Sequence, residues 1–183
     1  EVGAHVLSGN VLEPRALDEL WADWDNMDGC PLKTKVTKEK FLFLFEKSSF
    51  TVPSFLLPPV QHNKGNYIAS LANVCIWLGQ IAENLGVEIF PGMACSELLF
   101  GENGEVKGVV AGEFGKQPDG TISEGYEPGM ALYGKYVFLS EGVRGSLSKE
   151  VLAKYDLAKA CDLPKFGIGM KEIWEVTPEK HNK

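Results

Sequence analysis

The clearest structural signal in the chain is Val137-Phe138-Leu139-Ser140-Glu141-Gly142-Val143-Arg144-Gly145-Ser146-Leu147-Ser148. An apolar strand runs into Glu-Gly, a second glycine follows, and the next residue is a serine that can cap a helix. A strand that opens a helix in this way leaves backbone N–H groups at the helix N-terminus, where they can bind an anion such as a pyrophosphate. The alternative is an ordinary strand–turn–helix of an α/β protein.

The composition fits a single α/β domain and argues against nucleic acid as a partner. The chain has 183 residues, of which 44% are hydrophobic, and a net charge of −7 with a pI near 5.0. Its cysteines are widely spaced and indicate reduced thiols rather than a disulfide framework. No apolar run approaches the roughly 20 residues that span a bilayer. The N-terminus lacks a basic leader, so we expect no targeting peptide there.

Hydrophobic periodicity predicts two helices, a short one over residues 13–26 and a longer one over residues 66–86. In the short helix the apolar stripe that includes Trp21 and Trp24 is more often core than membrane contact. The longer helix has Asn66 as a candidate cap and Gly86 just after its end. The other predicted elements are strands at Val87–Phe90 and 132–140, a β-hairpin of Leu98–Phe100 with Val106–Ala111, and a polar surface excursion over 112–130.

Residues 41–60 carry an unusual density of large apolar side chains. The aromatic run Phe41–Phe45 predicts a buried or half-buried strand. The run from Phe50 to Val60 contains three prolines, which argue against regular structure. If Phe55, Leu56 and Leu57 are exposed, they form an apolar patch that could bind a partner or a membrane. Trp21 and Trp24 are candidates to join this patch. The alternative is a proline-rich loop that packs over the core.

Six ordered stretches resemble one family, that of electron transfer flavoprotein–ubiquinone oxidoreductase. The N-terminal Glu1–Asn10 resembles the loop after the second strand of its FAD domain, and the Glu141-Gly142 turn resembles a segment beside the FAD diphosphate in flavoproteins. The other matching stretches are Asn63–Ile68, Trp77–Gly79 with Ala82–Gly92, Gly104–Val109 and Phe166–Trp174. The matches cover nearly the whole chain but only an interior part of the family's enzyme.

The resemblance implies a fold and a set of site residues. The fold is α/β, a partial FAD-dependent oxidoreductase domain of the glutathione-reductase-like type with a parallel sheet over residues 1–160. Residues 161–183 would begin a quinone-binding α+β domain. The implied quinone contacts are Phe166, Gly167, Ile168 and Gly169, although the family usually has tyrosine where Phe166 stands. The implied FAD contacts are Gly3, His5, Ser8, Gly9, Glu141, Gly142, Gly145 and Ser146.

The resemblance also implies an activity. Such an enzyme takes electrons from reduced electron transfer flavoprotein through a 4Fe–4S cluster and FAD, and it reduces ubiquinone. It is a monotopic protein at the mitochondrial inner membrane, on the matrix side. No catalytic side chain and no metal ligand is assigned in this chain, because its three histidines, His5, His62 and His181, have no metal-ligand spacing and fit no hydrolytic triad.

Two departures from the family keep other functions open. The chain has no G-x-G-x-x-G turn, and Cys30, Cys75, Cys95 and Cys161 are too widely spaced for a compact cluster motif. The chain alone is therefore expected to be inactive and to bind FAD weakly or not at all. The alternative is a degenerate relative that acts as a structural or interaction subunit at the inner membrane. A flavin hydroxylase or reductase is a third interpretation, which the Phe166–Trp174 match disfavours.

Overall fold

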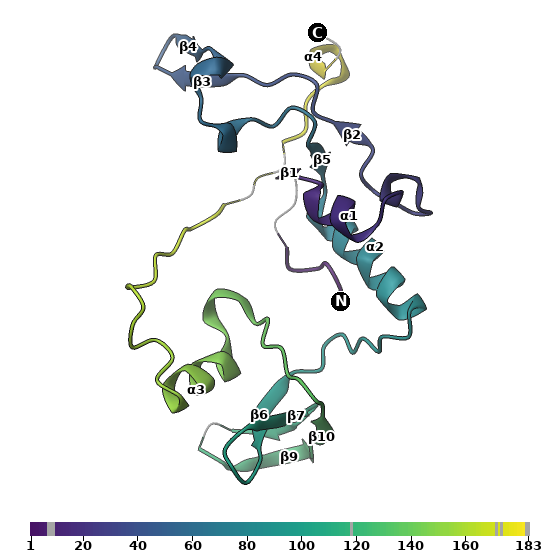
Figure 1. Cartoon of the computed structure of the whole chain (residues 1–183), viewed down its shortest axis with the longest axis vertical. Coiled ribbons are helices and arrows are strands. Elements are labelled where there is room, and N and C mark those ends of the chain that lie inside the picture. Colours follow the sequence, from purple (N-terminus) through teal and green to yellow (C-terminus); the bar gives the residue numbers. More distant parts are fainter. Residues whose placement is uncertain (7–9, 118, 171, 173, 182–183) are drawn as a thin grey trace. The chain divides into compact units, whose positions relative to one another are not determined.

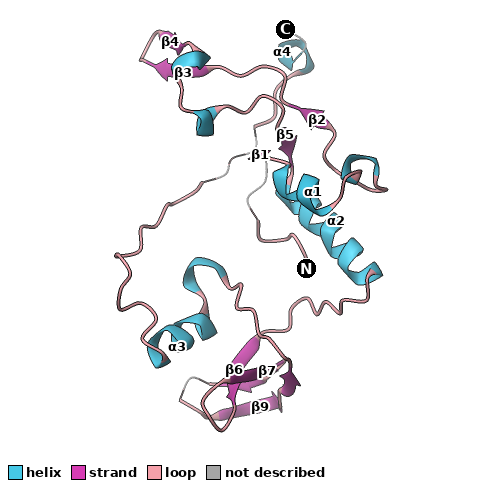
Figure 2. Ribbon diagram, viewed as in Figure 1, coloured by secondary structure: helices cyan, strands magenta, loops and turns pink. Residues whose placement is uncertain are grey.

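The computed structural model describes residues 1–6, 10–117, 119–170, 172 and 174–181. The chain forms two compact units, one of Glu1–Ile89 with Gly169–Lys183 and one of Phe90–Ile168. Each unit combines short helices with small sheets, as Figures 1 and 2 show. The predicted mixed α/β class is therefore confirmed. No helix in the described residues has the length and apolar character that crossing a bilayer requires.

The first unit is built on a three-stranded antiparallel sheet in the order β1-β5-β2. Asn10 pairs with Ala69 and Thr34 pairs with Ile68, so β5 is the central strand. In β5 the side chains of Tyr67 and Ala69 are buried and Ile68 is exposed, as the alternation of a half-buried strand requires. The elements are β1 Asn10–Leu12, α1 Arg15–Leu20, the 3-10 turn η1 Trp24–Asn26, β2 Thr34–Lys35, β5 Tyr67–Ala69, α2 Leu71–Asn84 and α4 Pro178–His181.

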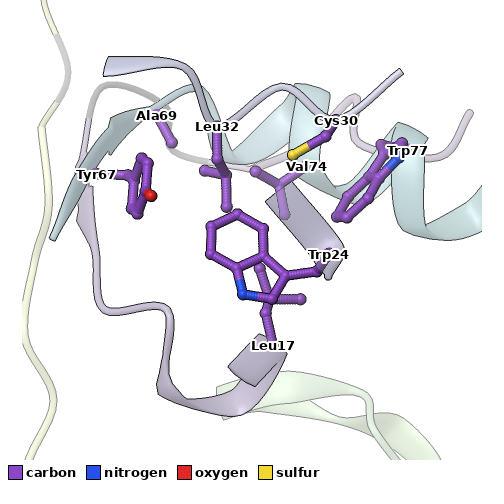
Figure 3. Close-up of a cluster of buried hydrophobic side chains, with 8 residues drawn as sticks. All are labelled: Leu17, Trp24, Cys30, Leu32, Tyr67, Ala69, Val74 and Trp77. Carbon is purple, nitrogen blue, oxygen red and sulfur yellow. The ribbon is translucent and has the colours of Figure 1, made fainter. Parts of the chain in front are cut away.

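The core of this unit lies between the sheet, α2 and the α1–η1 segment (Figure 3). The Trp24 and Tyr67 rings meet edge to face, with centroids 5.4 Å apart. Trp24 is thus a core residue and is unavailable to a membrane surface, while Trp21 is half-buried against the same cluster. The eight buried members are Leu17, Trp24, Cys30, Leu32, Tyr67, Ala69, Val74 and Trp77.

The predicted long helix is confirmed as α2, with a different start. Residues 67–69 pair with β1 and β2 as strand β5, so the helix begins after Ser70 rather than after Asn66. The Ser70 hydroxyl accepts a hydrogen bond from the N–H of Asn73 at 3.5 Å. At the other end Gly86 has φ +87°, and the N–H of Val87 donates to the carbonyl of Ala82 at 3.0 Å. This left-handed cap is the predicted role of Gly86.

Residues 37–64 leave the sheet after β2 and return to it before β5, and we call them the apolar arm. They hold the antiparallel hairpin of β3 Phe41–Leu44 and β4 Ser49–Val52, followed by the 3-10 turns η2 Ser54–Leu56 and η3 Pro59–Gln61. The predicted strand at Phe41 is confirmed, but its side chains are exposed instead of buried. Phe50 and Val52 lie in a strand as well, because Pro53 follows β4 and does not interrupt it.

The second unit holds two small antiparallel sheets and one helix. The predicted hairpin is confirmed as β6 Cys95–Phe100 with β7 Val106–Ala111, and β10 Met130–Tyr133 pairs with the other edge of β7. The predicted surface excursion folds into a second hairpin, β8 Phe114–Lys116 with β9 Ile122–Glu127. The 3-10 turn η4 Gly142–Arg144 and helix α3 Ser146–Lys154 follow.

The parallel sheet is not formed in the described residues, where every strand pair is antiparallel. The predicted strand 132–140 overlaps β10 only as far as Tyr133, and residues 136–140 have no ladder partner. Val87–Phe90 also lacks a partner. A strand exists only when a neighbour accepts and donates its backbone hydrogen bonds, so these two segments stay outside any sheet.

Candidate functional site

The Glu141 turn leads directly into α3, as the sequence predicts, and Glu141 itself caps this helix. Its Oε2 accepts hydrogen bonds from the N–H and the hydroxyl of Ser148, both at 2.7 Å. Its Oε1 accepts a hydrogen bond from the N–H of Leu147 at 3.2 Å. Leu147 and Ser148 are the second and third residues of α3, whose N–H groups a cap normally satisfies. The anion at this helix N-terminus is therefore the chain's own carboxylate.

The two glycines of the turn make this capping possible. Gly142 has φ +74°, a left-handed conformation that glycine adopts without strain. Gly145 occupies the N-cap position and has no side chain to serve as a cap. A Cβ on Gly145 would lie 2.7 Å from Oε2 of Glu141, closer than real contacts allow. The missing side chain of Gly145 thus leaves the space that the Glu141 carboxylate fills.

Helix α3 is held against the β6–β7 hairpin at both of its ends. Leu147 is fully buried at the first turn. At the last turn, the ammonium group of Lys154 lies 4.0 Å from the centroid of the Phe100 ring. Just beyond it, the Tyr155 hydroxyl donates a hydrogen bond to the carbonyl oxygen of Gly104. The Glu141 turn is therefore attached to a helix whose position is fixed.

A polar cavity of about 470 Å³ lies beside Ser146, the first residue of α3. In it the ammonium of Lys116 lies 2.7 Å from a Glu97 oxygen and 3.5 Å from a Glu113 oxygen. The Tyr126 hydroxyl donates to Glu113 at 3.0 Å. Burial of Glu113 acts to raise its pKa. The hydrogen bond from Tyr126 and the charge of Lys116 act in the opposite direction, and the pKa of Glu113 lies below its ordinary value. Two carboxylates against one ammonium give a net negative lining, which does not suit a diphosphate.

The electrostatics of the Glu141 turn suit hydroxyl groups and not phosphates. Hydrogen bonds from the Ser148 hydroxyl, and then from backbone N–H groups, hold the pKa of Glu141 below its ordinary value. The side chain is consequently a carboxylate at neutral pH. A carboxylate repels a diphosphate and accepts hydrogen bonds from hydroxyls, so the turn suits a ligand that carries hydroxyl groups better than one that carries phosphates.

The N-terminal loop packs on α2. Gly3 has φ +80°, and a Cβ there would lie 2.7 Å from the carbonyl oxygen of Ala72. The glycine is required by this contact within the first unit, whether or not a flavin lies nearby. His5 is exposed, and Ser8 and Gly9 lie outside the described residues. The FAD contacts implied in this loop and those implied in the Glu141 turn belong to different units, so a common binding site for one flavin stays a prediction.

The predicted quinone segment has no regular secondary structure. Phe166 and Ile168 are exposed, and a Cβ on Gly167 would meet no atom within 4 Å. No backbone approach therefore explains Gly167 in this structure. Gly169 lies in the first unit and the three residues before it in the second. Across the described part of the chain, no three His, Cys, Asp or Glu side chains are grouped to hold a metal ion.

Sequence reasoning missed the residues that close the base of the apolar arm. Glu39 accepts a hydrogen bond from the N–H of Asn63 at 2.6 Å, and its other oxygen lies 3.4 Å from Nδ1 of His62. Nε2 of His62 lies 3.2 Å from the carbonyl oxygen of Leu57. The hydrogen bond from Asn63 is the main cause that lowers the pKa of Glu39. No local pattern indicates a contact between residues 24 positions apart.

The arm exposes the apolar patch that the sequence predicts. Phe55 is 81% exposed and Leu56 is 65% exposed, whereas Leu57 is only partly exposed. Other large apolar side chains of the arm are exposed as well: Phe41, Leu42, Phe43, Leu44, Phe45, Phe50 and Val60. A concentration of this kind on one segment marks an interaction surface.

Comparison with known proteins identifies the relatives of the chain. It is 51% identical over 183 residues to an electron transfer flavoprotein-ubiquinone oxidoreductase of Pseudomonas aeruginosa, covering 99% of this chain and 33% of the relative. It is 45% identical to the mitochondrial protein of that name from Dictyostelium discoideum, covering 100% and 30%, and 43% identical to that from Bos taurus, covering 98% and 29%. No protein-family model matches the chain.

By name, these relatives are oxidoreductases of electron transport. The chain is a homologue, over nearly all of its length, of the electron transfer flavoprotein–ubiquinone oxidoreductase family, which confirms the resemblance seen in the sequence. It spans about a third of the length of the curated relatives it matches.

The Glu141 cap leads to a testable prediction. Glu141→Ala removes the acceptor for two N–H groups, so we expect α3 to fray and its amide protons to exchange faster with solvent. Because the pKa of Glu141 is lowered in the folded state, its contribution to stability is present above the ordinary value of 4.5 and is lost as the pH falls through the folded value. Hydrogen exchange at Leu147 and Ser148 measures this loss.

Glu150→Ala is the matched control, since Glu150 lies exposed on the same helix and caps nothing. Ser148→Ala should raise the pKa of Glu141 toward the ordinary value, because it removes the hydrogen bond that lowers it most. Unchanged exchange in Glu141→Ala would show that α3 does not depend on this cap.

Proposed function

We propose that the chain is part of an enzyme that passes electrons from reduced electron transfer flavoprotein through a 4Fe–4S cluster and FAD to ubiquinone. The observation that carries this proposal is the identity of 43–51% to relatives of that name over nearly the whole chain. The cluster ligands would come from outside this sequence. FAD and the cluster would supply the redox chemistry, and the residues of this chain would bind and orient the flavin and the quinone.

The fold that we propose for residues 1–160 is a partial FAD domain of the glutathione-reductase-like type, followed by the start of a quinone domain at 161–183. The segment before Glu141 supports this proposal. Phe138 is 87% exposed and has no ladder partner, although the run from Val137 to Leu139 is apolar. Such a segment suits a strand of a parallel sheet whose neighbours lie elsewhere in a longer protein.

In this proposal the flavin contacts come from two places. Glu141 would accept hydrogen bonds from ribityl hydroxyls, and Gly142, Gly145 and Ser146 would shape the turn around it. The N-terminal contacts would be Gly3, His5, Ser8 and Gly9. Because Glu141 already occupies the N-terminus of α3, we assign the diphosphate to no residue of this turn.

The quinone contacts that we propose are Phe166, Gly167, Ile168 and Gly169. Phe166 has no hydroxyl, so its contribution would be apolar contact with the ring or tail of the quinone. The exposed Phe166 and Ile168 are free to make such contacts. Backbone groups of the two glycines would supply the polar contacts.

We propose that the apolar arm contacts the membrane from which quinone is drawn, with Phe55 and Leu56 at its surface. Two of the relatives described above are named as mitochondrial, which supports a mitochondrial location. Within the organelle, we propose the inner membrane, on its matrix side. The exposed apolar side chains of the arm support contact with lipid, and a protein of this kind would lie on the bilayer without crossing it.

The second candidate is a degenerate relative that serves as a structural or interaction subunit at the same membrane. The observation that favours it is the cap on α3, where the chain's own carboxylate takes the place of a ligand anion. In that case the fold and the apolar arm would be retained and the electron transfer lost.

Three measurements on the native protein decide between these candidates. We expect an intact mass far above 20.1 kDa, a stoichiometric flavin absorbance, and ubiquinone reduction when reduced electron transfer flavoprotein is added. A mass near 20.1 kDa without flavin would instead support the structural subunit. A large flavoprotein that fails to oxidise electron transfer flavoprotein would reject the proposed electron donor.

A further inference from the structure

The apolar arm carries a charge opposite to that of the rest of the chain. Residues 37–64 hold four lysines and two glutamates, a net charge of +2 with His62 neutral, in a chain whose net charge is −7. The other residues therefore sum to −9. An anionic partner therefore attracts the positively charged arm and repels the negatively charged rest of the chain.

Three of the four lysines flank the exposed hairpin. Lys38 and Lys40 precede β3, and Lys47 lies in the β3–β4 turn, which the hydrogen bond from the N–H of Phe45 to the carbonyl of Ser48 closes at 2.8 Å. All three side chains are exposed, and none forms an ion pair within the described residues. Long lysine stems can lie along apolar surface while the ammonium groups reach charged headgroups.

The acidic residue at the base of the arm does not neutralise these lysines. Glu39 is turned toward the returning segment, where it accepts from Asn63 and pairs with His62. The exposed face of the hairpin thus combines apolar side chains with unpaired cations. This combination binds the headgroup boundary of an anionic bilayer through both burial and electrostatic attraction.

We propose that the apolar arm binds a bilayer surface that carries anionic phospholipid, with Lys38, Lys40 and Lys47 contacting its headgroups. This proposal rests on the membrane contact in the proposed function and adds the chemistry of the lipid. Pairing with the arm of a second copy is disfavoured, because two arms of net charge +2 repel each other. Exposed lysines and the nearby Pro53 also protect the edges of a two-stranded sheet against pairing with another chain.

The test measures binding of the full-length protein to vesicles of phosphatidylcholine alone and to vesicles with about a third phosphatidylglycerol. We expect tighter binding to the anionic vesicles at low salt, with the gain lost at high salt. Each lysine near an anionic surface contributes roughly fivefold, so Lys38→Gln/Lys40→Gln/Lys47→Gln should weaken this binding by roughly a hundredfold. Its binding to phosphatidylcholine vesicles should stay unchanged.

Lys135→Gln/Lys149→Gln/Lys165→Gln is the matched control, since it makes the same charge change at exposed lysines outside the arm. Equal loss in both triple variants would overturn the assignment to the arm. Equal binding of the wild type to both kinds of vesicle would overturn the anionic preference and leave the membrane contact standing. Absence of binding to either kind would reject the membrane contact itself, and self-association of the arm would be seen as a dimer without lipid.

Discussion

Trp77→Ala is expected to destabilise the first unit by about 3–5 kcal/mol, which is the usual cost of truncating a buried tryptophan. Trp77 is only 3% exposed, and its ring lies edge-on to Trp21 with centroids 6.5 Å apart. Its indole N–H donates to the carbonyl of Asp28 at 3.0 Å. In the alanine variant, α2 loses its packing against the segment that contains Trp21 and Asp28, and the hydrogen bond to Asp28 is lost as well. Urea unfolding followed by circular dichroism measures the shift in the midpoint.

Two controls define the source of this effect. Trp174, 80% exposed, should tolerate alanine within about 0.5 kcal/mol. Trp77→Phe keeps most of the apolar volume and removes the N–H donor, so it should lie between the wild type and the alanine variant. An equal effect of Trp77→Ala and Trp174→Ala would contradict the core described here.

Phe55→Ser/Leu56→Ser is expected to weaken vesicle binding by about a hundredfold or more, because each fully buried side chain of this size contributes roughly 1.5–3 kcal/mol. Both residues lie in the short turn η2, whose backbone Pro53 and Pro58 keep out of the sheet. Leu57 stays unchanged, since its side chain is only partly exposed. Flotation with phosphatidylcholine vesicles measures the apolar contribution without the electrostatic one.

Leu85→Ser/Phe114→Ser is the appropriate comparison, because these side chains are 75% and 72% exposed and lie outside the arm. They should leave flotation of the full-length protein unchanged. If the two double variants lose flotation equally, exposed apolar area in general, and not the arm, accounts for binding.

The elements that the sequence predicts well are those that local interactions encode. Helix α2 has its apolar period, and Gly86 supplies the left-handed cap, so both can be identified without knowing their neighbours. The β6–β7 hairpin is encoded in the same way by its turn. Exposure of Phe55 follows from the prolines around it. In each case the sequence within a few residues determines the backbone.

The remaining elements depend on contacts between distant segments. Tyr67–Ala69 has a helical pattern with the residues after it, yet it forms a strand because β1 and β2 supply hydrogen bonds on both sides. Trp24 was open to two interpretations until its contact with Tyr67 placed it in the core.

The Glu141 turn shows what a local pattern leaves undetermined. The turn at Glu141 predicts an anion at a helix N-terminus, and the structure places one there. That the anion is the carboxylate of Glu141 could not be predicted, since it depends on how closely the side chain folds back over Gly145. Gly3 is likewise explained by its close packing on Ala72, which no sequence motif indicates.

The base of the apolar arm makes this segment a closed insertion. Beyond the last pair of β2 and β5, the N–H of Val36 donates to the carbonyl of Asn66 at 2.8 Å, and the N–H of Gly65 donates back to Val36 at 3.1 Å. The chain leaves and re-enters the sheet at neighbouring points, so a longer or shorter arm changes only the entropy of loop closure. The arm can thus change in length and composition without disturbing the β1-β5-β2 sheet from which it departs.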